Sequence, residues 1–305
     1  MTDGSGAGPE ASLPPVAAAR VRAGRESGTW SSALSTAEFA AIRSVGFAPV
    51  GQVMGTTVVR IGFAGFGGCG YRQGMFGSGR ATTQTSAQNV WSGFAPLVRA
   101  HYDARRQAIG RLLAECAVLG GDGVVGVRLT VGPFLDADTL EFQAIGTAVR
   151  AAGEVRPGRP FSSHLSGQDF AKLVTAGWIP VSLVLGISIG IRHDDWAVRS
   201  QTGRVWAGNI EVDGWTELVQ HARHEARTHL QQDVWQQGAD GCVLSGMELS
   251  IRERECPNAE NQRDHIVRTV LLGTAVAAFR TRAPAAAPHS LAVLSLDRRG
   301  RQGAG

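Results

Sequence analysis

The chain has 305 residues, 43% of them hydrophobic, and a formal net charge of +4. Its length is that of two domains of ordinary size, and its hydrophobic content excludes a wholly disordered chain. The positive charge is concentrated in the C-terminal tail, so the body of the chain lacks the basic patch that nucleic-acid binding requires.

Neither a membrane span nor a leader is expected. The most apolar stretch, 180–191, has 12 residues, whereas a helix needs about 20 to cross a bilayer. Residues 1–33 are rich in Gly, Ala, Ser and Pro and lack the charged-then-apolar order of a signal peptide. We therefore expect a cytoplasmic protein.

Three segments lack the periodicity of helices or strands. Residues 1–33 are expected to form a disordered tail, 151–163 a linker between two domains, and 281–305 a flexible tail. The last of these contains a more apolar stretch, 289–297, that could dock on a neighbouring subunit or another partner.

The rest of the chain is a repeat. Between 34–55 and 165–186, nine of 22 aligned positions are identical, against about one or two expected by chance. The identical pairs are Leu34 and Leu165, Ser35 and Ser166, Phe39 and Phe170, Ala40 and Ala171, Gly46 and Gly177, Pro49 and Pro180, Val50 and Val181, Val53 and Val184, and Gly55 and Gly186. The chain therefore contains two copies of one domain, at 34–150 and 164–280.

Each copy begins with a short helix and a strand. In the first copy, Ser35 as N-cap and Glu38 three residues later have the spacing of a capping box. A glycine then ends the helix in both copies. The β-branched runs 50–61 and 181–191 that follow predict strands.

A long helix and two further strands complete each copy. Apolar residues recur every three or four positions from 97 to 116 and from 215 to 234, which keeps one helix face continuous. Strands are predicted at 124–131, 140–149, 242–251 and 266–279. The fold class is therefore α+β, each domain being a small three-stranded, mainly antiparallel sheet with one long helix.

Four short motifs make the chain resemble the YbjQ-like family. They are Leu-Gly-Gly-Asp-Gly-Val-Val-Gly at 119–126, Ile-Gly-Thr-Ala-Val at 145–149, Gly-Ala-Asp-Gly-Cys-Val at 238–243 and Leu-Gly-Thr-Ala-Val at 272–276. The resemblance implies two tandem dodecin-like domains that assemble into rings, typically pentamers. The family is named for heavy-metal binding, but the resemblance carries no ligand set onto this chain.

The cysteines do not form a metal motif, because no Cys-x-x-Cys pair occurs among Cys69, Cys116, Cys242 and Cys256. Cys116 and Cys242 align with valines of the other copy, which predicts core packing. Cys69 and Cys256 lie in loops present in one copy only, so neither belongs to a site common to the fold.

A histidine cluster on the second long helix is the candidate metal site. His221, His224 and Glu225 lie at i, i+3 and i+4, and could bind Zn²⁺ or Ni²⁺. The other interpretation is a solvated polar face. His224 and His229 are five residues apart, not four, which excludes a zincin motif. His101, on the apolar stripe of the first long helix, is expected to lie in the core or at an interface.

The first copy carries a glycine-rich insert at 62–80. Its aromatic residues Phe63, Phe66, Tyr71 and Phe76 predict a loop that contacts another subunit or lines a ring pore. The insert contains Gly-x-Gly-x-x-Gly, but no helix pattern begins there, so a dinucleotide site is not expected.

No enzyme is expected from the sequence. The repeated Asp122 and Asp240 follow helix-ending glycines, where an aspartate suits a turn. No catalytic set recurs in both copies, and no cofactor beyond a divalent metal is expected.

The leading interpretation is a non-enzymatic, ring-forming scaffold or binding protein. A three-stranded sheet with one helix leaves an edge and part of a face uncovered, and self-association covers both. Five chains in two stacked pentameric rings are favoured, with a pseudo-hexameric trimer as the other closed arrangement. The alternative function is metal binding or sequestration by the surface histidines of the second domain.

Overall fold

The structure, a computed structural model, describes most of both domains. The described residues are 13–27, 31–60, 81–86, 94–134, 139–203, 209–256 and 262–279. The insert 62–80 and the tail 281–305 lie outside them.

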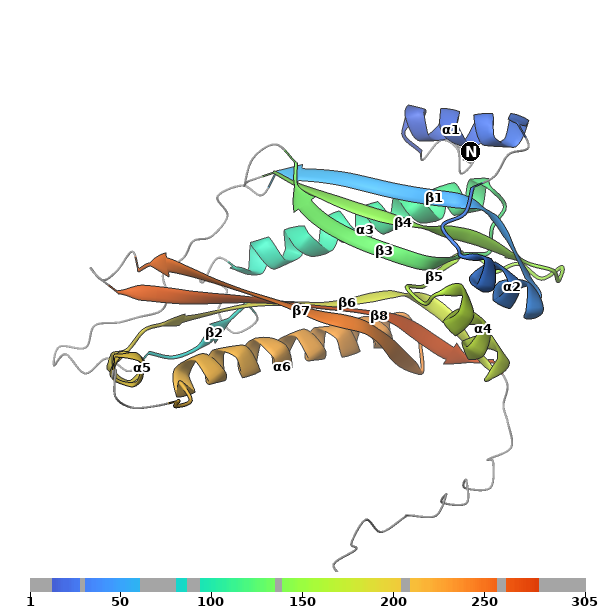
Figure 1. Cartoon of the computed structure of the whole chain (residues 1–305). Coiled ribbons are helices and arrows are strands. Elements are labelled where there is room, and N and C mark those ends of the chain that lie inside the picture. Colours follow the sequence, from blue (N-terminus) through green and yellow to red (C-terminus); the bar gives the residue numbers. More distant parts are fainter. Residues whose placement is uncertain are drawn as a thin grey trace, which may run out of the picture.

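The described residues confirm two copies of one α+β unit (Figure 1). The first copy comprises α2 (Thr36–Ser44), β1 (Phe47–Arg60), α3 (Phe94–Val118), β3 (Gly123–Pro133) and β4 (Thr139–Ala151). The second comprises α4 (Gly167–Thr175), β6 (Trp178–His193), α6 (Asp213–Gln236), β7 (Gly241–Glu255) and β8 (Arg263–Ala278). Four further elements are α1 (Pro15–Ser27), β2 (Gln84–Thr85), β5 (Phe161–Ser162) and α5 (Trp196–Thr202).

The last long strand of each copy lies in the middle of its sheet. The first sheet has the order β1-β4-β3-β5 and the second β2-β6-β8-β7. All pairs are antiparallel except β3 with β5. The expected three-stranded sheets are therefore present, and each gains one short strand from outside its own copy.

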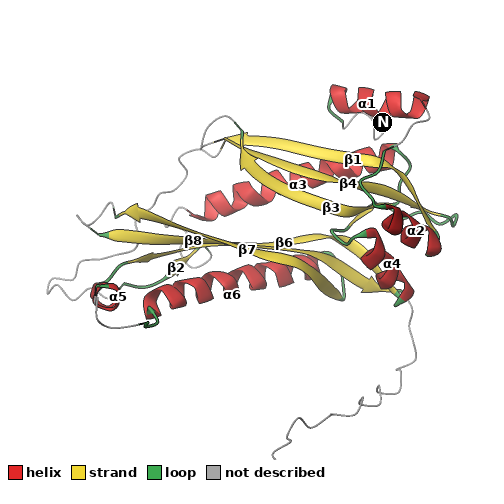
Figure 2. Ribbon diagram, in the orientation of Figure 1, coloured by secondary structure: helices red, strands yellow, loops and turns green. Residues whose placement is uncertain are grey.

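The two copies pack as four layers in the order sheet, helix, sheet, helix (Figure 2). α3 lies between the sheets, because Leu112 packs in a cluster with Val53 of the first sheet and Val98 in a cluster with Ile187 of the second. α6 covers the opposite face of the second sheet. The second sheet is thus covered by a long helix on both faces. Among the described residues, the first sheet has one long helix, α3, and the short helices α2 and α4 pack against part of it near Val125 and Val149.

Two repeated glycines permit this packing. A Cβ atom at Gly55 would lie 1.9 Å from the Ala108 carbonyl oxygen, and one at Gly186 would lie 2.0 Å from that of Ala226. The long helix of each copy therefore lies directly against the backbone of the first strand, and a side chain at either position would separate them.

The repeated Gly-Thr-Ala-Val motif has a structural role in both copies. Thr147 is buried, and its hydroxyl accepts a hydrogen bond from the Ala33 N–H at 3.2 Å. Thr274 is also buried and accepts one from the His164 N–H at 3.1 Å. Each threonine therefore fixes the segment that enters the short helix of its own copy.

Side chains of the long helices form hydrogen bonds with backbone groups at the outer edges of β1 and β6. The Met54 N–H donates to Glu115 Oε2 at 2.8 Å, and the equivalent Leu185 N–H donates to Asp233 Oδ2 at 2.9 Å. His229 contacts the Ile187 carbonyl through Nδ1 at 2.8 Å. Polar residues on these helices therefore protect sheet edges.

The N-terminal segment differs from the expectation of a disordered tail. α1 lies within 1–33, and Leu13 and Val21 pack against Val118 at the end of α3. Arg20 also forms an ion pair with Glu115. These contacts between alanine-rich helices order part of the segment, which its low hydrophobicity did not suggest. Among the described residues, no helix is both long and apolar enough to cross a membrane.

Candidate assembly surface and metal-ligand cluster

The second domain covers the sheet edge of the first. β5 lies in the expected linker 151–163 and pairs in parallel with β3. The pairing continues beyond β5, where the Ser163 N–H donates to the Val124 carbonyl at 2.8 Å and the Val127 N–H donates to the Ser163 carbonyl at 2.9 Å. The paired segment then leads directly into α4.

An aromatic cluster completes this contact between the domains. Phe170 of α4 is fully buried and stacks on Phe161 with ring centroids 5.6 Å apart. It also meets the Phe47 ring edge-on, with centroids 5.0 Å apart. Leu165 packs in the same cluster as Val125 of β3, which is 0% exposed. The second domain therefore supplies part of the core of the first.

The equivalent edge of the second domain is bare. β7 is the last strand of its sheet in the described residues. Val243 aligns with the buried Val125, yet it is 36% exposed. Phe39 aligns with the fully buried Phe170 but is only half-buried. Other exposed apolar residues of β7 are Leu244, Met247 and Ile251.

The two sheets differ in the same way on the face that is turned away from their own long helix. On β6 this face carries Leu185 and Ile187. α3 packs against this face, and both residues are buried. The aligned residues of β1 are Met54 and Thr56, and Met54 is 38% exposed. The sheet edge is therefore covered in the first domain and open in the second. The sheet face turned away from the long helix is covered in the second domain and open in the first.

Glu225 does not lie with the two histidines predicted to share a metal ion with it. His221 and His224 are exposed on α6, whereas Glu225 is buried. The Glu225 carboxylate accepts hydrogen bonds from Ser188 of β6 and, at 3.2 Å, from Ser86. Glu225 therefore lies on the sheet side of the helix and not on the histidine face, because it is also three residues from the buried Ala222. Metal binding by the two histidines stays a prediction.

The repeated aspartates lie in turns. Asp122 Oδ2 accepts from the Ala151 N–H at 2.8 Å, and Asp240 Oδ2 accepts from the Ala278 N–H at 2.9 Å. In both copies the carboxylate therefore joins the start of the second strand, β3 or β7, to the end of the last one, β4 or β8. Arg156 also pairs with Asp122 at 2.6 Å.

Cys116 and Cys242 have the character of packing residues. Cys116 is 0% exposed in the first core, and Cys242 packs beside the second. Burial raises the pKa of the Cys116 thiol to about 12 and that of Cys242 to about 11. Both thiols are therefore protonated at neutral pH and poorly suited to bind a metal.

His101 is a core histidine between the sheets. It is buried, with its ring edge-on to Phe142 at 5.6 Å between centroids. Arg105 donates to its Nδ1 at 3.0 Å. Burial, followed by the positive charge of Arg105, lowers the pKa of His101 to about 3. Its imidazole is therefore neutral at pH 7.

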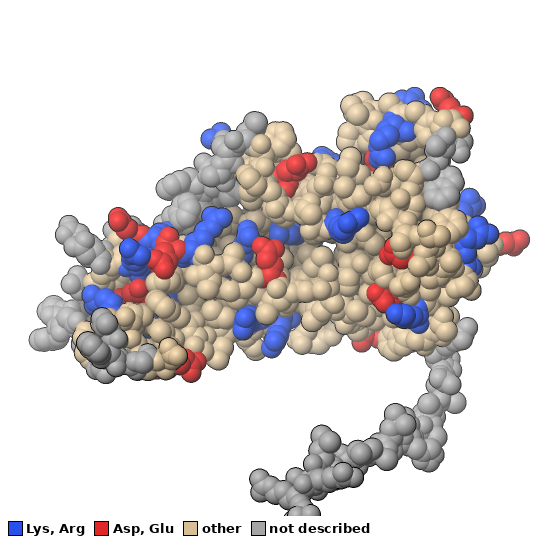
Figure 3. Space-filling view, in the orientation of Figure 1, with Lys and Arg blue, Asp and Glu red and all other residues tan. Residues whose placement is uncertain are grey.

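The aromatic residues Phe63, Phe66, Tyr71 and Phe76 lie outside the described residues. On the face drawn in Figure 3, acidic and basic side chains are interspersed and leave large uncharged areas between them. This surface does not show the continuous basic patch of a nucleic-acid interface.

A separate cluster of metal-ligating side chains lies at the far end of the second sheet. In the described residues, His193, Cys256 and Asp264 form the one group of three whose ligand atoms all lie within 4.8 Å of one another. They are 0%, 6% and 0% exposed. Sequence reasoning missed this group because its members come from three different strand ends, and none lies in the repeated blocks.

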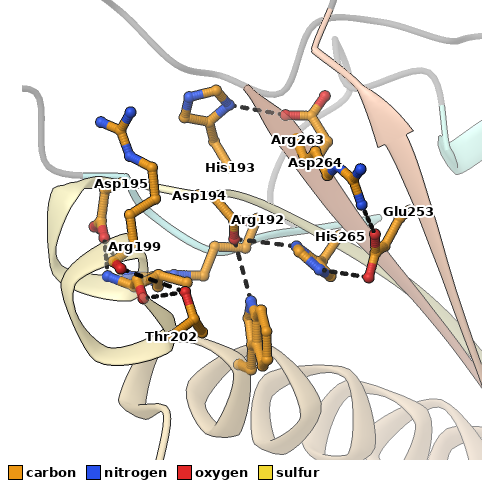
Figure 4. Close-up of polar contacts among 12 residues, drawn as sticks. Arg192, His193, Asp194, Asp195, Arg199, Thr202, Glu253, Arg263, Asp264 and His265 are labelled. Atoms are coloured by element: carbon orange, nitrogen blue, oxygen red, sulfur yellow. Dashed lines mark hydrogen bonds and ion pairs between the residues drawn. The ribbon is translucent and has the colours of Figure 1, made fainter. Parts of the chain in front are cut away.

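A second polar cluster lies beside it, on the other side of the strands (Figure 4). His265 Nδ1 lies 3.1 Å from Asp194 Oδ1, and its Nε2 lies 3.3 Å from Glu253 Oε1. The hydrogen bond to Asp194 is the main cause of the raised pKa of His265. Trp215 also donates to Asp194 at 3.1 Å. This cluster is a closed ion-pair network that ties α6 to the strand ends.

Comparisons with known proteins identify a family and a long relative. The model of a family described as "Putative heavy-metal-binding", the YbjQ-like family, matches residues 86–152. The encapsulin nanocompartment protein Rv1762c of Mycobacterium tuberculosis is 36% identical over 238 residues, which cover 76% of this chain and 82% of the relative. A UPF0145 protein of Shewanella frigidimarina is 46% identical over 48 residues, 16% of this chain and 44% of its own.

These comparisons show which family the chain belongs to. Neither the family's description nor the mycobacterial relative's name is that of an enzyme, in agreement with the expectation of a non-enzymatic protein. The similarity to the mycobacterial protein extends over most of both chains, whereas the family model covers part of the first domain. The chain belongs to the YbjQ-like family, in the long form that it shares with the mycobacterial protein.

Proposed function

We propose that this chain is a non-enzymatic scaffold or binding protein that assembles head to tail, by repeating between chains the contact seen between its own domains. The observation that carries the proposal is the bare edge of β7, with Val243 exposed where the aligned Val125 is buried. In the assembly, residues 31–44 of one chain cover β7 of the neighbouring chain, as β5 and α4 cover β3 within a chain.

The contact has a direction, which limits the possible assemblies. Phe170 of the second domain enters the first, but the aligned Phe39 does not enter the second in the same way. A contact of this type is heterologous and generates a closed ring or an open filament. If both domains of a chain lie in one ring, the number of domains must be even. This favours the three-chain pseudo-hexamer over two stacked pentameric rings.

The second half of the proposed contact involves the open face of the first sheet. Within the chain, Val98 and Tyr102 of α3 pack against the second sheet. The aligned residues of α6 are Thr216 and Gln220, which would lie against Met54 and Thr56 of the neighbouring chain. The contact between chains is therefore more polar than the contact within one, as is usual for surfaces that must also be soluble when uncovered.

The native mass of tag-free protein, measured by light scattering and native mass spectrometry, tests this proposal. Three times the chain mass of 32.1 kDa is the expected result, whereas five chains would support stacked pentamers instead. Val243→Glu should give monomers, because a carboxylate would be buried at the contact. Val155→Glu, at a position 89% exposed in the linker, should keep the wild-type mass. A monomeric wild-type protein would overturn the proposal.

The name of the mycobacterial relative supports a structural role in a larger protein assembly. A cytoplasmic location and docking of residues 289–297 on a neighbour stay predictions of the sequence. Sequestration of metal by His221 and His224 is the second candidate, and both residues are exposed as that function requires.

A further inference from the structure

The cluster of His193, Cys256 and Asp264 is built from three strand ends. His193 is the last residue of β6, and Asp264 is its partner in the register with β8. Cys256 directly follows β7, and its N–H donates to the Gln262 carbonyl at 2.8 Å across the β7–β8 connection. The sheet therefore holds all three side chains in place, with no dependence on a long loop.

The contacts of Asp264 orient its two oxygens differently. Oδ1 lies 2.9 Å from His193 Nδ1, and Oδ2 accepts a hydrogen bond from Arg254 Nε at 3.2 Å. Gln262 Oε1 contacts His193 Nε2 and adds an amide oxygen to the group. Figure 4 shows His193 and Asp264 pointing toward each other, away from the His265 network. Arg254 thus anchors one carboxylate oxygen while the other remains on the side of the imidazole.

We propose that His193, Cys256 and Asp264 bind one divalent metal ion of the zinc class. A thiolate, an imidazole and a carboxylate are the three ligand types that proteins use for zinc. Zinc–ligand distances of about 2.0–2.3 Å place the ligand atoms of a tetrahedral site about 3.3–3.8 Å apart. The three ligand atoms here all lie within 4.8 Å of one another, so they are close enough to share one ion. Gln262 or a water molecule would supply a fourth ligand.

Binding of the ion releases one proton from the protein. The Cys256 thiol loses its proton to solvent and the sulfur becomes a thiolate ligand of the ion. Asp264 binds as a carboxylate, and His193 binds through a neutral ring nitrogen. The ion, the thiolate and the carboxylate then sum to zero net charge, which suits a buried position.

The proposed site is specific to the second domain. The β7–β8 part of the chain is nine residues longer than its counterpart in the first copy, and Cys256 lies in that extension. The family match at 86–152 does not include any of the three residues. The site is therefore distinct from the repeated motifs and from the exposed histidines of α6.

Cobalt provides a direct probe of the site. Full-length protein, prepared with chelator and reductant, is titrated with Co²⁺ and then with Zn²⁺. The expected result is a thiolate-to-cobalt charge-transfer band that saturates at one ion per chain and disappears when Zn²⁺ displaces the cobalt. Cys256→Ser and His193→Gln should each lower the affinity at least tenfold and abolish or shift the band.

Two controls separate this site from others. Cys242→Ser removes a thiol outside the cluster, and the double variant His221→Gln/His224→Gln removes the exposed histidines of α6. Both should keep the band and the affinity. If the double variant lost the metal while Cys256→Ser kept it, the ion would be held on α6 and the proposal would be wrong.

A measurement on the wild-type protein guards against variants that fail to fold. Alkylation of Cys256, followed by peptide mass spectrometry with and without Zn²⁺, should show at least tenfold protection by the metal. Cys242 in the same sample should show no such protection. Equal alkylation of Cys256 in both conditions, or the absence of a stoichiometric cobalt band, would overturn the assignment.

Discussion

The two domains have the same fold but different surroundings. The β3 edge of the first domain is covered by β5 and by the aromatic cluster around Phe170, whereas the β7 edge of the second is open. The same alignment places a buried valine at 125 and an exposed one at 243. The comparison teaches that the chain covers this sheet edge in its first domain, and that among the described residues the second domain has no equivalent cover.

The glycines that both domains share give a large expected effect in each domain. Gly186→Ala and Gly55→Ala should each lower the free energy of unfolding by about 3 kcal/mol, because the new Cβ meets a helix carbonyl oxygen that cannot move independently. Gly110→Ala is the control, since its Cβ would enter open space and alanine favours a helix by about 1 kcal/mol. Urea unfolding of each variant measures the differences. Equal effects at all three positions would contradict the close helix–strand contact.

The aligned phenylalanines sharpen the comparison between the domains. Phe170→Ala should cost about 3–5 kcal/mol in the free energy of unfolding, as expected for a fully buried ring. Phe39→Ala should cost clearly less in urea unfolding of dilute protein, because its ring is half-buried within one chain. Its main effect should appear in the native mass at high concentration. Equal costs for the two variants would mean that the domains are equally covered.

The smallest of these effects concerns pH and the core between the sheets. The pKa of His101 falls to about 3 in the folded chain from its ordinary value of 6.5. The unfolded chain therefore binds an extra proton between these pH values, and stability falls as the pH decreases below about 6.5. From pH 7 to pH 5 this histidine should cost about 2 kcal/mol.

His101→Gln should remove that part of the pH dependence, as measured by urea unfolding at pH 7 and pH 5. The pKa of His265 is raised, so its contribution has the opposite sign and is lost as the pH rises. The difference between wild-type protein and the His101→Gln variant isolates His101, because the His265 contribution is common to both. An unchanged slope would mean that His101 is not buried as described.

The sequence predicted the order of the elements, because the repeat supplied two independent readings of each. Ser35 and Glu38 form the expected capping box, and the glycines end the helices where expected. It could not predict that β5, in the expected linker, would pair with β3, since a pairing of two residues carries too little pattern to recognise. Helix spacing placed Glu225 on the face of His221 and His224, whereas the structure buries it against two serines that compensate its burial.

The metal-ligand cluster was hidden for a different reason. His193 and Asp264 are 71 residues apart in sequence and meet only through the β6–β8 register. Cys256 was set aside because it lies outside the repeat, although a site private to one copy need not recur. Sequence spacing can reveal ligands on one helix or loop, but not ligands that converge from three strand ends.

The head-to-tail contact is tested most directly by mixing two complementary variants. Val243→Glu blocks the β7 surface and leaves Phe39 intact, whereas Phe39→Glu blocks the segment that should cover β7 and leaves Val243 intact. Each variant alone should be a monomer by native mass spectrometry. An equimolar mixture should give a complex of two chains and nothing larger, because only one competent contact can form. A mixture that stays monomeric, or a single variant that keeps the wild-type mass, would contradict the account.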